Sequence, residues 1–103
     1  MMNYDFAKME KLTFRETDLS GAILTRSDII ECNLENVKFV NADLRGTKFI
    51  QCNLKNVDFS NANLNGVKFA GSDLTGAKGL DRYFIDNKNS ISTTIGEIHK
   101  ERW

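Results

Sequence analysis

The sequence contains no proline, one histidine and two cysteines among its 103 residues. A chain without proline can donate a backbone hydrogen bond at every position, which suits an architecture made largely of paired backbone. One histidine and two cysteines are too few for a tetrahedral metal site, so we expect no bound metal and no cofactor. Two cysteines are also too few for a disulfide scaffold, which favours a cytoplasmic protein with reduced thiols.

A net charge and long apolar segments are missing as well. Fourteen Lys and Arg residues balance fourteen Asp and Glu residues. The chain therefore has no global basic field, and we expect no direct nucleic-acid binding. No segment approaches the roughly 18 consecutive apolar residues of a membrane-spanning helix, and the N-terminus lacks the apolar core of a secretory signal. We expect no membrane association.

What the sequence does have is a repeat. Residues 31–50 and 51–70 are identical at 12 of 20 positions. A shorter period lies beneath: a large apolar residue, the centre of each unit, stands at every fifth position from Phe14 to Leu74, with a smaller residue two places before it. A period of five matches neither an α-helix nor a straight strand. It fits short sides separated by corners, and the twenty-residue identity indicates that four sides close one turn of a parallel coil.

The units NADLR, NANLN and GSDLT, at residues 41–45, 61–65 and 71–75, carry a recognisable pattern. They resemble the pentapeptide-repeat family, whose pattern is A(D/N)Lxx. The resemblance implies an all-β fold, the right-handed quadrilateral parallel β-helix, with residue n stacked on residue n+20. We assign residues 1–11 to an N-terminal cap and residues 12–78 to the β-helix. Residues 79–103 are predicted to form a non-repeat segment that caps the coil or mediates a homodimer, with a short helix from Thr94 as one option.

The same geometry argues against catalysis. A narrow shaft filled by its own side chains leaves no cleft in which reacting groups could meet a substrate, so the chain is predicted not to be an enzyme. Cys32 and Cys52 are one turn apart and therefore stacked, with Cβ atoms expected about 4.8 Å apart. That spacing is wider than a relaxed disulfide prefers, so both are predicted to be reduced, inert core thiols.

One outward column of the predicted coil is unusually apolar. Ile30, Ile50 and Ala70 stack at positions that should face solvent, and Val40 is expected on a neighbouring side. With Trp103 in the tail, these residues are the predicted interaction surface, to be covered by a protein partner, a second copy or the chain's own tail.

The predicted function is a non-enzymatic protein-binding or scaffold module of unknown partner. The resemblance offers an alternative, a DNA-mimicking binder of DNA gyrase, because the family's quinolone-resistance members resemble DNA in shape and acidity and bind that enzyme. Mimicry of a polyanion needs a continuous negative track. Residues 12–78 carry eight Lys or Arg and eight Asp or Glu residues, so the sequence favours the first function.

Overall fold

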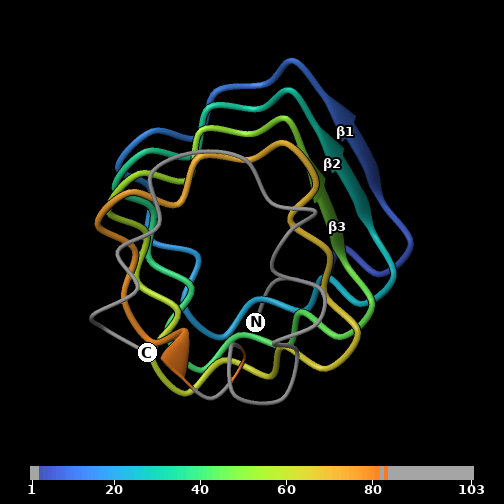
Figure 1. Cartoon of the computed structure of the whole chain (residues 1–103). Helices are drawn as coiled ribbons and strands as arrows, with labels where there is room; N and C mark the ends of the chain where they lie inside the picture. Colours follow the sequence, from blue (N-terminus) through green and yellow to red (C-terminus); the bar gives the residue numbers. More distant parts are fainter. Residues whose placement is uncertain (1–2, 82, 84–103) are drawn as a thin grey trace.

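The chain winds into stacked turns around a common axis (Figure 1). The computed structural model describes residues 3–81 and 83. Three short strands lie on one side of the coil: β1 (Lys8–Glu10), β2 (Asp28–Ile30) and β3 (Lys48–Ile50). They form a parallel sheet in the order β1-β2-β3, and each residue pairs with the residue twenty positions later. The fold is the right-handed quadrilateral β-helix that the repeat predicts.

The other three sides are held by single bridges in the same register. Examples are Thr13↔Asn33, Asp18↔Lys38 and Ile23↔Asp43. The pairing begins before residue 12, because Asn3 bridges to Ile23 and β1 pairs with β2. Residues 3–11, which the sequence assigned to an N-terminal cap, are thus paired within the first turn of the coil.

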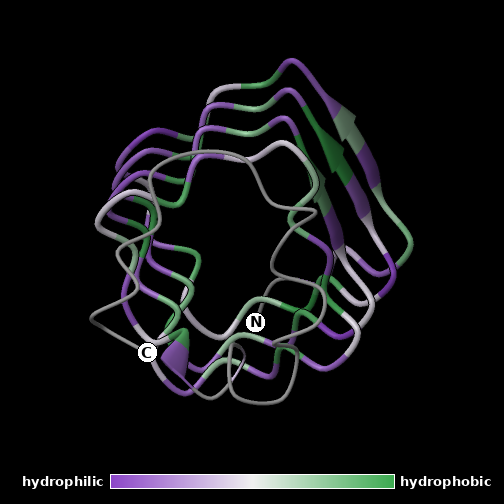
Figure 2. Ribbon diagram, viewed as in Figure 1, coloured by the Kyte–Doolittle hydropathy of each residue, from purple (hydrophilic) through white to green (hydrophobic). Residues whose placement is uncertain are grey.

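The interior is built from the large centres and the small residues two places before them. The centres from Leu24 to Phe59 and Val37 and Val57 are almost inaccessible to solvent. Phenylalanine rings stack along the axis, with centroids 5.7 Å apart for Phe39 and Phe59 and 5.6 Å apart for Phe49 and Phe69. Hydropathy colouring shows apolar and hydrophilic residues alternating along every turn, with an apolar segment in β2 (Figure 2). Identical rings one turn apart therefore pack against each other inside the shaft.

Most corners use the same turn, in which the N–H of the small residue that opens a side donates to the carbonyl of the preceding centre, as from Val37 to Leu34 at 3.0 Å. The corners after β1, β2 and β3 lack this bond, and the Cys52 N–H donates to the Ser72 hydroxyl at 3.1 Å instead. The residue two places after each centre has positive φ at every corner from Phe6 to Gly76. This combination describes a type II turn, whose third residue must be left-handed. Five of these fifteen corner positions are glycine, and ten are not.

The regular stacking ends at Gly79. The last bridge joins Asp58 to Lys78, and Gly79 then occupies the position of the next centre. Leu80 and Tyr83 are buried beyond it. The Tyr83 ring packs edge-on against Phe69 at 5.1 Å, and its hydroxyl donates to the Val67 carbonyl at 2.9 Å. The predicted helix from Thr94 lies outside the described residues, as does nearly all of the predicted capping or dimerisation segment.

Among residues 3–81 and 83, no helix is long and apolar enough to cross a membrane.

Candidate functional site

The side of the coil that carries β1–β3 has an apolar outward column. Ile30 and Ile50 pair directly and are half-buried, and Ala70, one turn further, is exposed. The structure therefore brings these three predicted surface residues together. We call Ile30, Ile50 and Ala70 the lateral stripe. Side chains at these positions project from the coil, so the stripe contributes nothing to the packing of the shaft.

Val40 is not part of the lateral stripe. It follows the centre Phe39 and lies ten residues from Ile30, which is half of the twenty-residue turn. Four sides share one turn, so ten residues place Val40 on the opposite side of the coil, and the predicted neighbouring position was wrong. Trp103, the fifth predicted surface residue, lies outside the described part of the chain.

Two exposed lysines flank the lateral stripe. Lys48 and Lys68 are bridged one turn apart on the same side, each two residues before a member of the stripe. None of the ion pairs in residues 3–81 and 83 involves either lysine. Like charges stacked across a ladder repel each other. Asp28 stands opposite Lys48 on β2, whereas Lys48 and Lys68 bring two positive charges together beside the apolar column.

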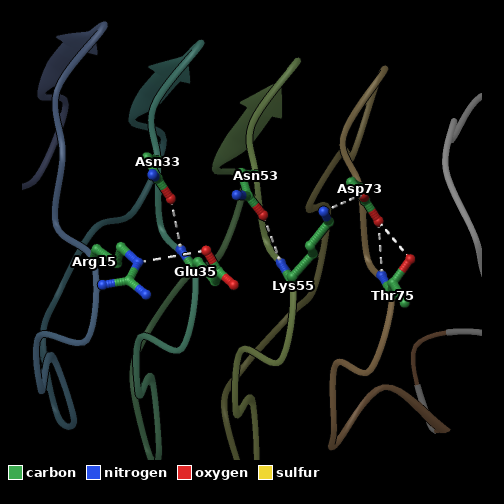
Figure 3. Close-up of polar contacts among 7 residues, drawn as sticks. All are labelled: Arg15, Asn33, Glu35, Asn53, Lys55, Asp73 and Thr75. Atoms are coloured by element: carbon green, nitrogen blue, oxygen red, sulfur yellow. Dashed lines mark hydrogen bonds and ion pairs between the residues drawn. The ribbon is translucent and has the colours of Figure 1, made fainter.

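The other columns of charge are internally balanced. Arg15 lies 3.5 Å from Glu35, and Lys55 lies 3.9 Å from Asp73, each pair joining adjacent turns on one side (Figure 3). Exposed pairs of this kind add little stability, but they neutralise the surface on which they lie. No continuous negative track forms on this side.

Asn and Asp residues that directly precede a centre stabilise turns through their side-chain oxygens. The side-chain oxygens of Asn33, Asn53 and Asp73 each accept the N–H of the residue two places later, at 3.0–3.1 Å (Figure 3). These are Asx turns, which the short side chains of Asn and Asp favour. In the part of the chain that the structure describes, no group of three His, Cys, Asp or Glu residues could hold a metal ion.

Small polar residues inside the shaft link consecutive turns. The Ser27 hydroxyl donates to the Tyr4 carbonyl at 2.8 Å and the Ser72 hydroxyl to the Phe49 carbonyl at 2.8 Å, both across 23 residues. The Cys52 thiol donates to the Ile29 carbonyl at 3.2 Å with the same separation. The sequence identified these positions as small, and their polar role became visible only with the fold.

Both cysteines are free and buried, as predicted. Burial raises the pKa of Cys52 to about 11, so its thiol stays protonated near neutral pH. A thiol needs to be ionised and accessible to act as a nucleophile. Cys32 and Cys52 therefore belong to the packing of the shaft.

The N-terminal end of the coil contains a cavity of about 280 Å³. Its wall is apolar and comes from the first two turns: Tyr4, Ala7, Met9, Leu12, Phe14, Leu19, Leu24, Ile29, Leu34 and Phe39. The sequence reasoning missed this cavity because it treated residues 1–11 as a cover for the shaft. The spacing of Tyr4 and Met9, which continues the five-residue series, was the signal that the shaft extends to this end.

Comparison with known proteins agrees with this geometry. The family model described as pentapeptide repeat region matches residues 7–78. A pentapeptide repeat protein from the Arabidopsis thaliana thylakoid lumen is similar in structure, with a TM-score of 0.71 and 26% identity. The match covers 74% of this chain and 52% of that one. No curated protein sequence matches the chain.

Two other solved structures show weaker similarity. HetL, involved in heterocyst differentiation regulation in the cyanobacterium Nostoc sp. strain PCC 7120, has 23% identity and a TM-score of 0.35, over 74% of this chain and 41% of that one. QnrB1, a plasmid-mediated fluoroquinolone resistance protein, has 22% identity and a TM-score of 0.39, over 93% of this chain and 45% of that one. The matched region thus spans about half the length of each of these three solved structures.

Proposed function

The chain belongs to the pentapeptide repeat family, and on that premise we propose that it is a non-enzymatic protein-binding module. The observation that supports this function is the lateral stripe beside Lys48 and Lys68. A shaft closed by its own side chains can present flat faces, and this face combines an apolar column with two exposed lysines that form no ion pair within residues 3–81 and 83. The partner we propose has an apolar surface bordered by carboxylates, and the two free thiols favour a cytoplasmic setting.

Affinity capture with surface variants of the full chain tests this function. We expect Ile30→Thr/Ile50→Thr and Lys48→Glu/Lys68→Glu each to lose proteins that the wild type captures from a lysate of the source organism. Threonine is β-branched like isoleucine, so the first pair preserves strand preference while removing apolar surface.

Val40→Thr is the matched control, because it makes the same kind of change on the opposite side of the coil. Its captured proteins should equal those of the wild type. If neither pair of variants changes the captured proteins, or if Val40→Thr changes them as much, the lateral stripe is not the binding surface.

The alternative function, a DNA-mimicking binder of gyrase, is not favoured by the charges. Asp18, Lys38, Asp58 and Lys78 bridge in one column in which the sign alternates at every turn. A gyrase supercoiling assay separates the two functions. Salt-sensitive inhibition by the pure chain would support the alternative, and no inhibition is expected.

A further inference from the structure

Apolar exposure in residues 3–81 and 83 is concentrated at the N-terminal end. The large apolar side chains that are well exposed are Tyr4, Phe6 and Leu12, at 43%, 66% and 44% of their accessible surface. All three belong to the first turn, which also surrounds the 280 Å³ cavity. Phe6 in addition has a φ of 57°, an unusual value for a bulky residue. Tyr4 and Leu12 also line the cavity, whereas the Phe6 ring lies beside it under the Arg26 guanidinium, 5.1 Å from the ring centroid.

The backbone at this end offers unused hydrogen-bonding groups. The N–H groups of Lys8, Thr13 and Asp18 find no acceptor within the described part of the chain. Their counterparts one turn later do donate to the first turn: Asp28 to Ala7 at 2.9 Å, Asn33 to Leu12 at 2.9 Å and Lys38 to Thr17 at 3.1 Å. β1 is therefore an open edge strand, and such an edge can pair with another extended chain.

A second copy of this chain is a poor occupant. An end-to-end dimer about a twofold axis would place the same concave surface on both sides of the interface. The two cavities would merge into a single apolar void of twice the volume, and empty core volume is destabilising. The cavity requires a convex apolar group, such as one large side chain. An apolar cavity of about 150 Å³ already accepts benzene, so this larger one accepts an aromatic ring.

The charges on β1 indicate which residues should flank the inserted apolar side chain in a bound segment. Lys8 and Glu10 face outward on either side of Met9, and their charged groups lie 3.6 Å apart. In the parallel register of the coil, Asp28 pairs with Lys8 and Ile29 with Met9. A strand added on the other edge of β1 would match it with an acidic residue over Lys8, a large apolar residue over Met9 and a basic residue over Glu10.

We propose that the N-terminal end of the coil binds an extended segment of a partner protein, in which a large apolar residue stands between an acidic and a basic residue. The segment pairs in parallel with β1 and inserts its apolar side chain into the cavity beside Met9. This inference rests on the proposed protein-binding function and adds a second surface, at the end of the coil, to the lateral stripe.

Methyl and amide NMR of the full chain, titrated with synthetic peptides, tests the inference. The probe is a nine-residue peptide with Asp-Phe-Lys at its centre, flanked by serine and threonine. We expect it to shift the Met9 methyl signal and to slow hydrogen exchange at Lys8 and Thr13. A peptide with Asp-Ala-Lys should bind at least tenfold more weakly, because alanine buries much less apolar surface in the cavity than phenylalanine does. A peptide with Lys-Phe-Asp should also bind more weakly.

Two variants separate binding at the edge from general damage. Lys8→Pro removes an N–H that donates to nothing in the described chain, so it should abolish peptide binding and leave the melting temperature unchanged. Lys8→Glu/Glu10→Lys should reverse the preference between the Asp-Phe-Lys and Lys-Phe-Asp peptides. Equal binding of the phenylalanine and alanine peptides would overturn the inference.

Two further outcomes would replace the partner segment by another occupant and so overturn the inference. Contacts between the Met9 methyl group and residues 84–103 in the free protein would show that the chain's own tail fills the cavity. A concentration-dependent dimer that Lys8→Pro abolishes would show that a second copy does. Both outcomes concern the N-terminal end and not the lateral stripe. Loss of captured proteins in the Ile30→Thr/Ile50→Thr variant would therefore still support the proposed function.

Discussion

Gly79 lies at the end of the regular stacking. Its replacement by alanine tests whether the close approach of its backbone to the preceding turn requires glycine. A Cβ atom at this position would lie 2.6 Å from both the Phe59 carbonyl carbon and the Ser60 nitrogen. Both are backbone atoms of the turn above, so they cannot move without separating two turns of the coil. Gly79 also has a φ of +82°. Gly21, with a φ of +76° and no atom within 4 Å of an added Cβ, is the matched control.

The two variants should therefore differ in stability. A left-handed backbone costs alanine about 1–2 kcal/mol, offset by about 0.4–1 kcal/mol from its more restricted unfolded chain. Gly21→Ala should lower the free energy of unfolding by about 1 kcal/mol or less. Gly79→Ala adds overpacking of about 1–3 kcal/mol and should cost about 1–4 kcal/mol in total. Urea titrations followed by circular dichroism measure the free energy of unfolding of both variants. Equal losses within about 0.5 kcal/mol would refute the idea that the added Cβ atom at residue 79 clashes with the preceding turn.

Three further predictions concern the shaft and its turns. Leu44→Asp should abolish the cooperative melt, because Leu44 is fully buried and an unpaired carboxylate there has no partner; a melting temperature near wild type would contradict this. Cys52→Ser should keep stability within about 1 kcal/mol of wild type in urea titrations, because the hydroxyl can donate to the Ile29 carbonyl as the thiol does; a larger loss would show that the sulfur volume matters more than the hydrogen bond. Asp58→Asn should reduce the loss of stability, measured as the free energy of unfolding, that occurs as the pH falls below 5. Hydrogen bonds from the Ser60 hydroxyl, and next from its N–H, lower the pKa of Asp58 from its ordinary value near 3.8. Its contribution is therefore present above that value and lost as pH falls through the lower folded pKa, whereas asparagine holds the same turn without ionising. Urea midpoints between pH 2 and 5 measure this, and an unchanged slope would contradict it.

The register of the coil was predictable from the sequence because only one register buries every centre. A shift of one residue would turn Leu34 and Leu54 toward solvent and their outward neighbours into the shaft. The twenty-residue identity then fixed which turns stack, and the pairing of Asp28 with Lys48 agrees. The five-residue spacing and the twenty-residue identity together are therefore compatible with one fold, the four-sided coil.

The beginning of the coil was harder to predict. Residues 3–11 keep the spacing of the centres but carry only parts of the repeat signature: Asn3 precedes Tyr4, and Ala7 stands two places before Met9, where Lys8 takes the place of the Asn or Asp. In this turn Leu12 occupies a position that other turns give to Cys32 or Cys52. The five-residue spacing decides the backbone pairing, and the residue types decide only how well the turn is packed. A prediction based on signature therefore placed the boundary too late.

The two ends of the coil differ in a way that bears on function. In a solenoid each turn is stabilised by its neighbours alone, so a terminal turn keeps one unpaired edge and one open side of the core. At the C-terminal end, Leu80 and Tyr83 cover the last centres, and the Tyr83 hydroxyl uses a carbonyl of the shaft. At the N-terminal end, no described residue does the same for Met9 and Phe14. Because the interior of the coil is closed along its length, a change in what residues 3–81 bind must arise from the outward columns or from the ends of the coil. The N-terminal end has both the cavity and the free backbone groups that binding requires.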